Sequence, residues 1–203
     1  MLLVDLIDAL AKRHMVRAFT PKPVDEVAIV QLLHAAMRGP SAGNTASLQV
    51  LVLAEEQCQL YWETTLTPQR RTSFPWPKLL LAPLLLIPTV DPHDYVARYS
   101  EPDKVHTALG QSANQWPVPY WWVDGGAAVE NVLLMATSLG LGACFFGQFE
   151  HETALSRRFG IPDGRRALGT IAVGHPDGEA ERPSHSSQRL TATVDERTHW
   201  GTW

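Results

Sequence analysis

Two arginines, Arg13 and Arg17, stand four residues apart just after the first predicted helix. Side chains at this spacing share one face of a helix or converge at its end. Each guanidinium presents a planar fork of N–H donors, which suits a phosphate or another anion. A solvated basic patch would show the same spacing, so the two arginines alone predict only that an anion site is possible here.

A second polar segment, residues 40–44, reads Pro-Ser-Ala-Gly-Asn. Its glycine and proline indicate a loop, and Ser41 and Asn44 supply a hydroxyl and an amide. Because an amide both donates and accepts, it suits the edge of a planar heterocycle that carries C=O and N–H groups. An ordinary turn is equally compatible with this composition.

The elements that must position these residues surround a central apolar helix. Residues 129–139 carry apolar side chains at helical spacing, and Gly140 and Gly142 predict that the helix ends there. We expect a tight turn at residues 140–147, where the backbone approaches a ligand closely. A core helix that turns directly into a strand is the simpler alternative.

The rest of the chain predicts more helix than strand. Helices are expected over residues 2–13, 24–37, 55–66 and 152–159, with one more around Tyr95 or Val105; strands are expected over 49–54, 79–87 and 167–174. Residues 62–122 are rich in Trp and Pro, and residues 116–122 are expected to be irregular. This segment is a candidate lid, with Trp116, Tyr120, Trp121 and Trp122 closing over a pocket, or a long loop packed on the core.

Several classes of function are disfavoured. The net charge of −4 argues against non-specific nucleic-acid binding. Eight dispersed histidines and two distant cysteines form no metal motif, and no G-x-S-x-G or G-x-G-x-x-G is present. The first residues do not read as a signal peptide, and residues 79–88 are too few to span a bilayer as a helix, so we expect a cytoplasmic protein.

Four segments in order resemble motifs of the nitroreductase family. Residues 13–19, R-H-M-V-R-A-F, resemble its R-R-S-V-R-x-F opening, and residues 38–45 resemble its A-P-S-A-G-N segment. Residues 130–142 are similar to its Q-N-x-L-L-A-A…G-L-G helix, and residues 161–162 and 171–176 to its closing I-P and A-L-G-Y-P elements. The sequence departs from the family at Met15, where Ser or Lys is usual, and at residues 45–48, where Q-P-W is lost.

The resemblance implies an α+β fold with a small, mostly antiparallel sheet flanked by helices. It also implies an intertwined homodimer with two FMN sites at the subunit interface. Residues 1–203 would form a single flavin-binding domain, with a C-terminal arm from about residue 177 to 203 that reaches the partner subunit.

The resemblance also assigns roles to thirteen residues. Arg13 and Arg182 would bind the phosphate, and His14 and Met15 the flavin side chain; Arg17 would lie near the N1/C2 carbonyl edge, where its charge stabilises reduced flavin. From the partner subunit, the ring would meet Pro40, Ser41, Ala42 and Asn44. Along its other side would lie Phe145, Phe146, Gly147 and Gln148, with a backbone N–H reaching N5.

The implied activity is hydride transfer from NAD(P)H through flavin N5 to nitroaromatic, quinone or related acceptors. The cofactor supplies the chemistry, so no catalytic side chain and no metal are expected. One alternative is an FMN storage protein with an occluded nicotinamide site and little turnover. Another is an enzyme of the same fold that takes electrons from a deazaflavin.

Overall fold

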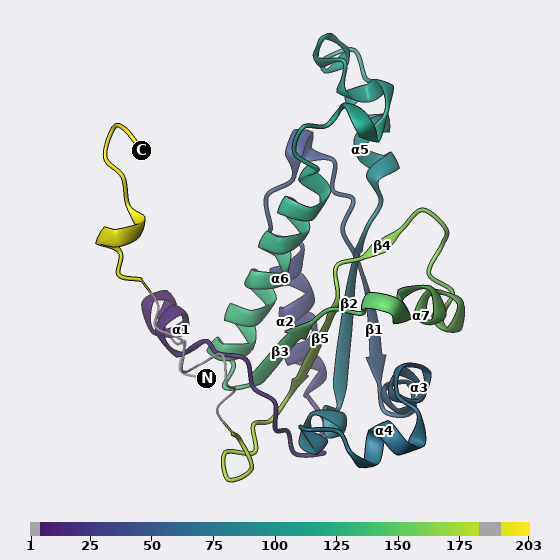
Figure 1. Ribbon diagram of the computed structural model, residues 1–203, viewed down its shortest axis with the longest axis vertical. Coiled ribbons are helices and arrows are strands. Elements are labelled where there is room, and N and C mark those ends of the chain that lie inside the picture. The colour runs from purple at the N-terminus through teal and green to yellow at the C-terminus, as the bar shows by residue number, and fades with distance from the viewer. Residues whose placement is uncertain (1–4, 183–191) are drawn as a thin grey trace.

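The computed structural model describes residues 5–182 and 192–203, and a small antiparallel sheet lies at its centre (Figure 1). The strands are β1 (Gln49–Ala54), β2 (Leu84–Val90), β3 (Gly142–Phe146), β4 (Arg166–Ala167) and β5 (Thr170–Gly174). They run in the order β1-β2-β5-β3, and β4 pairs with β2. Every strand pair is antiparallel, while Met15 adds a parallel bridge to Ala143 at the β3 edge.

Helices cover both faces of this sheet. On one face pack α2 (Glu26–Ala36) and α6 (Tyr120–Ser138), and on the other α3 (Glu56–Thr65) and α7 (Glu152–Phe159). Strand β2 is buried along its whole length, so its alternate residues feed the two layers. Leu84 and Leu86 pack under α6, and Leu85 and Ile87 pack in the layer of α3 and α7. The α+β architecture expected from the sequence is confirmed.

Helix α6 is longer than the sequence predicted. It begins at Tyr120 rather than near residue 129, so the expectation of irregular backbone at residues 120–122 is wrong. Pro119 stands directly before the helix, and a proline at the start of a helix does not prevent the helix from forming. Leu139 caps the end and Gly140 has φ 71°, but Gly142 already belongs to β3. The predicted tight turn is therefore a turn into a strand.

Strand β2 lies further along the chain than predicted. Residues Pro77–Leu81 form a 3-10 helix, and the strand runs from Leu84 to Val90. Pro83 therefore stands just before the strand, whereas Pro88 lies inside it, opposite Val50 of β1, with its carbonyl accepting from the Leu168 backbone N–H at 2.9 Å. The sequence did not reveal where the strand starts, because leucines occur both in the 3-10 helix and in the strand.

The Trp- and Pro-rich segment folds into several short elements. Helix α4 (Pro68–Thr72) follows α3, and α5 (Pro92–Tyr99) precedes three 3-10 turns between residues 105 and 115. Trp116 and Trp121 are buried and pack edge-on against Tyr95. These two tryptophans therefore form a satellite core beneath α5, as the packed-loop interpretation expected, whereas Tyr120 and Trp122 are 43% and 36% exposed.

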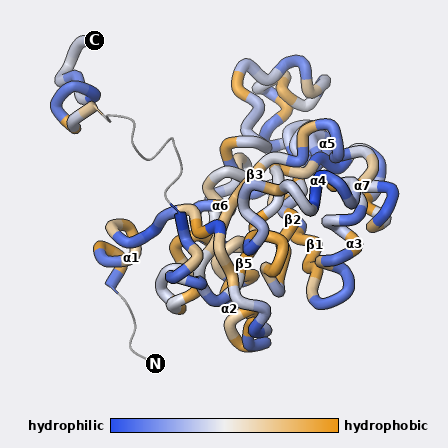
Figure 2. The backbone as a smooth tube through the Cα atoms, turned by 60° about the horizontal axis from the view of Figure 1, so that its bottom comes forward, coloured by the Kyte–Doolittle hydropathy of each residue, from blue (hydrophilic) through white to orange (hydrophobic). Residues whose placement is uncertain are grey.

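The two ends of the chain carry apolar side chains that the single chain leaves exposed. Helix α1 (Leu6–Lys12) exposes Leu6, Ile7 and Leu10, and Figure 2 shows its apolar residues at the margin of the fold. The last described residues, with a 3-10 turn at Asp195–Arg197, lie beyond α1 and away from the sheet (Figure 1). Trp200 and Trp203 there are 90% and 100% exposed. No helix among the described residues is long and apolar enough to cross a membrane.

Candidate flavin site

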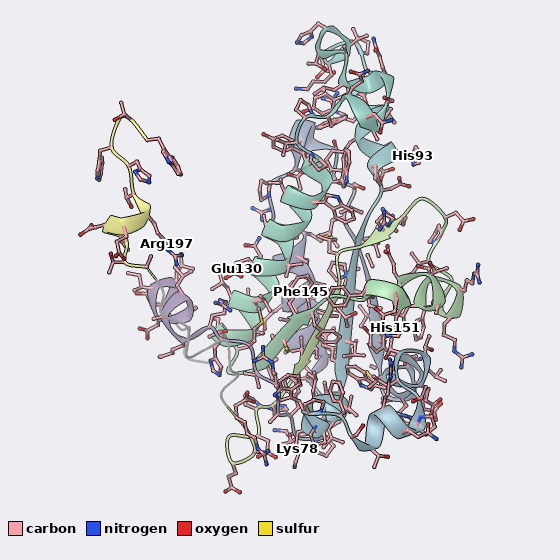
Figure 3. All side chains as sticks on the ribbon, in the orientation of Figure 1. Lys78, His93, Glu130, Phe145, His151 and Arg197 are labelled. Atoms are coloured by element: carbon pink, nitrogen blue, oxygen red, sulfur yellow. The ribbon has the colours of Figure 1, made fainter. Side chains whose placement is uncertain are left out.

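A cavity of about 270 Å³ lies at the end of β3, and we call it the aromatic cavity. Five of the predicted residues line it: Arg17, Phe145, Phe146, Gly147 and Gln148. Trp62 and Trp76 complete its walls from α3 and from the segment after α4. Figure 3 labels Phe145 and His151, two of its lining residues, which lie between α6 and α7 in that view. Its mostly apolar, aromatic lining is suited to a planar ring system.

Arg17 lies at the wall of this cavity, where several groups fix it. Its guanidinium stands 5.6 Å from the centre of the Trp76 ring and donates to the Met15 carbonyl at 3.2 Å. The backbone N–H groups of Arg17 and Ala18 donate to the carboxylate of Glu181 at 2.8 to 3.2 Å. These bonds bring residue 181, and with it the exposed Arg182, to the segment that carries Arg17. Two predicted anion ligands thus come from neighbouring segments.

Arg13 is held by helix α6. Its Nε lies 3.2 Å from Oε1 of Glu130, and its side chain keeps 30% exposure. Figure 3 labels Glu130 on the side of α6 that faces α1. Because this contact uses Nε alone, the remaining N–H donors of the guanidinium fork can still receive a phosphate. Glu130 is a residue whose role the sequence reasoning did not find.

His14 and Met15 differ in their surroundings. The His14 ring is exposed, and its Nδ1 lies 2.9 Å from the Lys12 carbonyl oxygen. The Met15 sulfur accepts a weak hydrogen bond from the Phe145 backbone N–H at 3.4 Å. Met15 therefore uses its side chain to hold the edge of β3.

The loop at residues 40–44 lines a second, smaller cavity of about 130 Å³, which we call the loop cavity. Pro40, Ser41 and Asn44 line this cavity. Ala42 does not line it, but its backbone N–H donates to Asp124, which does. Neither cavity has a lining residue in common with the other. In one chain, then, the two predicted halves of the flavin site are separate, as expected if residues 40–44 serve the partner's flavin.

Helices α5 and α6 hold this loop in a fixed shape. Buried Asp124 accepts hydrogen bonds on Oδ2 from the Ala42 backbone N–H at 2.7 Å and from the Tyr95 hydroxyl at 2.9 Å. Burial raises the pKa of Tyr95, so its hydroxyl remains a donor at physiological pH. Arg98 donates from Nε to the Gly43 carbonyl at 2.8 Å. Sequence reasoning missed these three residues, because the predicted helix began after Asp124 and the partners of all three are distant in the chain.

Gly43 is the residue in this loop whose backbone requires glycine. Its φ is 63°, and a β-carbon there would approach the Tyr99 ring to 2.8 Å. Gly147 is different, because its φ lies outside the left-handed region and the nearest atoms to its β-carbon would be those of the exposed Phe149 ring, also at 2.8 Å. A side chain at position 147 would therefore meet the exposed ring of Phe149 first, and this ring can turn aside.

Two buried polar atoms on the walls of the aromatic cavity have no hydrogen-bond partner among the described residues. They are the side-chain carbonyl oxygen of Gln148 and the indole N–H of Trp62. Buried polar groups in proteins are nearly always paired, so an orphaned acceptor and an orphaned donor at one cavity point to a missing ligand or water. Within residues 5–182 and 192–203, no cluster of side chains could hold a metal ion.

Comparison with known proteins gives one family. The profile of the "Nitroreductase family" matches residues 10–175. A Methanothermobacter thermautotrophicus protein, provisionally named for NADH dehydrogenase and NAD(P)H nitroreductase activity, is 27% identical over 89% of this chain and 80% of its own length. A Thermus thermophilus protein named NADH dehydrogenase is 24% identical over 90% of this chain and 91% of its own.

Solved structures agree on the fold. An FMN- and NADPH-dependent nitroreductase from sphigopyxis sp. strain HMH superposes with a TM-score of 0.70 at 20% identity, covering 98% of this chain and all of the other. An FMN-dependent nitroreductase from Clostridium difficile R20291 gives 0.66 at 18% identity, covering 97% and 99%. Together with the profile match over most of its length, the sheet order and the helix layers, this establishes that the chain belongs to the nitroreductase family.

Proposed function

We propose that this protein is an FMN-dependent oxidoreductase that takes hydride from NAD(P)H and reduces nitroaromatic, quinone or related acceptors. The observation that carries the proposal is the aromatic cavity at the end of β3, which combines a largely apolar, aromatic lining with Arg17 and two orphaned polar atoms. An apolar slot with a few convergent polar groups is typical of cofactor sites. The related FMN-dependent nitroreductases support the choice of FMN.

The residues present fit FMN at both of its ends. For the ring, the cavity offers aromatic walls, an acceptor on Gln148 and a donor on Trp62. For the phosphate, Arg13 and Arg182 supply two guanidiniums from two segments, which Glu181 ties together through the backbone N–H groups of Arg17 and Ala18. Arginine forks match the oxygen geometry of a phosphate, and they remain charged at any physiological pH.

Each of this chain's groups would have a simple task. Arg17 would place positive charge beside the ring, and Asp124 would keep residues 40–44 in the shape needed to meet a partner's ring. The aromatic walls would exclude water from one face. When bound, FMN supplies the redox chemistry by accepting a hydride from the nicotinamide and passing electrons to the acceptor.

We further propose that the working unit is a homodimer. The two cavities that hold the predicted ring contacts do not meet within one chain, so a second chain must bring residues 40–44 to the aromatic cavity. The exposed apolar residues of α1, α2 and the C-terminal arm provide surface for that contact, among them Ile7, Val27, Trp200 and Trp203. Isolated exposed apolar side chains are common, but gathered ones mark interfaces.

Anaerobic reduction of the FMN-loaded protein tests the proposed function. We expect NADPH or NADH to bleach the flavin absorbance within seconds, and a quinone or nitroaromatic to restore it. Bound flavin that persists with both donors would contradict the reductase proposal and support the storage alternative or another electron donor. Protein that binds no FMN would contradict every flavin-based proposal.

A further inference from the structure

The side-chain amide of Gln148 is held in one orientation by the buried hydroxyl of Thr170, which is also bonded to the Tyr61 hydroxyl. Its Nε2 donates to Thr170 Oγ1 at 3.0 Å, and the Tyr61 hydroxyl lies 2.8 Å from the same oxygen. All three side chains are buried, and burial raises the pKa of Tyr61 to about 12, so its hydroxyl keeps its proton. The amide nitrogen is therefore used inside the protein, and only the carbonyl oxygen is left over.

That carbonyl oxygen is a buried acceptor without a partner among the described residues. An unpaired buried acceptor destabilises a protein, so a protein that keeps one gains from a ligand that donates to it. Gln148 is 5% exposed and lies on the wall of the aromatic cavity. A ligand that enters this cavity is therefore placed to supply the missing donor.

A donor of the opposite kind stands on the same cavity. The Trp62 indole N–H is also buried and without a partner in the described chain, while its ring stacks on Phe146 at 5.8 Å and 20°. One orphaned acceptor and one orphaned donor match a group that presents N–H beside C=O. Amides and imides have this edge, whereas a nitro group or a quinone offers acceptors only.

We propose that Gln148 and Trp62 recognise the amide or imide edge of a planar heterocycle, with Tyr61 and Thr170 as positioning residues for Gln148. This inference rests on the proposed function, because the two ligands of that function both carry such an edge. One is the imide of the flavin ring, with N3–H between two carbonyls, and the other is the carboxamide of nicotinamide. The shared chemistry is an N–H that donates to Gln148 and a C=O that accepts from Trp62.

Ligand analogues that lack the N–H test the acceptor without changing the fold. In the unmodified protein we expect N3-methyl-FMN to bind about tenfold more weakly than FMN if Gln148 meets the flavin imide. If it meets the nicotinamide instead, oxidised 3-acetylpyridine adenine dinucleotide should bind the FMN-loaded protein about tenfold more weakly than NAD⁺. Equilibrium titration of the flavin spectrum reads both affinities without turnover.

Variants then assign the effect to the residue. Gln148→Met keeps the length of the side chain and removes the carbonyl, so it should weaken the binding of FMN or NAD⁺ at least about fivefold. The analogue ratio, which is the Kd of the analogue divided by the Kd of its parent ligand, should fall to within about twofold of one for the ligand that Gln148 meets. Trp62→Phe keeps the stack on Phe146 and removes the N–H, so it should weaken the same ligand. Tyr61→Phe should have a smaller effect in the same direction. Gln57→Met on the exposed face of α3 is the matched control and should change nothing.

The outcomes separate this inference from the proposed function. If FMN binds and both analogue ratios are near one in the unmodified protein, the recognition of an N–H by Gln148 is overturned while the flavin proposal stands. If the ratios are large but survive Gln148→Met, another residue accepts the N–H and the inference is again overturned. If the unmodified protein binds no FMN, the proposed function and this inference fail together.

Discussion

Single side chains decide how tightly the phosphate and the ring would be held. Arg13 is the sharpest case, because its Nε is committed to Glu130 and the rest of its fork is available. Arg17 has the opposite arrangement, since the cavity wall and the Met15 carbonyl already fix its guanidinium. We therefore expect Arg13 to contribute mainly to binding, and Arg17 mainly to the electrostatics of the ring.

Replacing Arg13 should weaken FMN binding without unfolding the protein. Arg13→Ala removes a charge-assisted partner worth about 1.5–3 kcal/mol, or roughly 10- to 150-fold in Kd. Arg13→Lys should fall between, because an ammonium keeps the charge and loses the fork. Fluorescence titration with FMN measures both, and Arg157→Ala on the exposed side of α7 is the matched control. An unchanged Kd for Arg13→Ala would remove this residue from the phosphate site.

Gly147→Val should lower FMN affinity and leave the fold intact. The backbone of Gly147 is not in the left-handed region, and its nearest neighbour is the exposed ring of Phe149, which can turn aside. The new side chain would project into the aromatic cavity that Gly147 lines. Thermal unfolding should shift no more than for Gly178→Val, whose β-carbon meets open space. Full FMN affinity in Gly147→Val would show that the ring does not lie beside this residue.

At the scale of elements, the helices act mainly by fixing loops. Asp124 from α6 and Tyr95 and Arg98 from α5 converge on residues 40–44, so the loop is shaped by elements that follow it by fifty to eighty residues. Helix α7 is tied to the sheet in a similar way. Glu152 accepts from Arg166 at 2.8 and 3.0 Å and from the Ala167 backbone N–H at 3.2 Å.

Asp124→Ala should destabilise the protein and loosen the loop. Both donors on Oδ2 would remain buried without a partner, which we expect to cost about 2–4 kcal/mol. Tyr95→Phe removes one donor together with its need for an acceptor, so it should cost only about 1 kcal/mol. Urea unfolding of the apoprotein measures both. A loss below about 0.5 kcal/mol in Asp124→Ala would mean that the loop does not depend on this carboxylate.

The link between α7 and β4 should weaken in acid. The Arg166 guanidinium lowers the pKa of Glu152 below its ordinary value of about 4.3. A depressed carboxyl pKa contributes stability that is complete above the unfolded-state pKa and is lost as the pH falls through the lower folded-state pKa. Unfolding free energies should therefore fall below about pH 4, and Glu152→Gln should be less stable at pH 7 with a shallower acid limb. Parallel acid limbs in the two proteins would contradict this role.

At the scale of the whole molecule, the single chain is incomplete in two respects. Its apolar N-terminal helix and its tryptophan-tipped C-terminal arm lack a surface to cover, and its two cavities each hold only part of the predicted ring contacts. A second copy would supply both. The single domain with an embracing arm therefore remains our proposal for how the chain is organised, although residues 183–191, within that arm, lie outside the described residues.

Removing the tryptophans of the arm should weaken the dimer. Trp200→Ser combined with Trp203→Ser takes away two large side chains, each of which we expect to bury about 150–250 Å² in a partner. Analytical ultracentrifugation should show a higher dimer dissociation constant, and the fold of each chain should remain. Val105→Ser, which replaces another exposed apolar residue in the first of the 3-10 turns between residues 105 and 115, serves as the control. A dimer of unchanged stability would show that the arm does not embrace the partner.

Sequence patterns predicted what depends on local chemistry and missed what depends on distant contacts. The helix at Glu56–Thr65 and the strand at Gln49–Ala54 followed from periodicity, and the family motifs led to the fold. The start of α6 was wrong because prolines before Tyr120 looked disruptive, although a helix can begin directly after one. Glu130, Asp124 and Glu181 could not be assigned from sequence, because their partners lie 82 to 164 residues away or on another helix.

The measurement that tests the central claim most directly is size-exclusion chromatography with light scattering and in-line flavin absorbance on the FMN-loaded protein. We predict a single peak at twice the 22.5 kDa mass of one chain, carrying one FMN per chain. That result would place the flavin in a site that two subunits complete. Flavin that elutes with the mass of a single chain, or a dimer that carries none, would contradict the account.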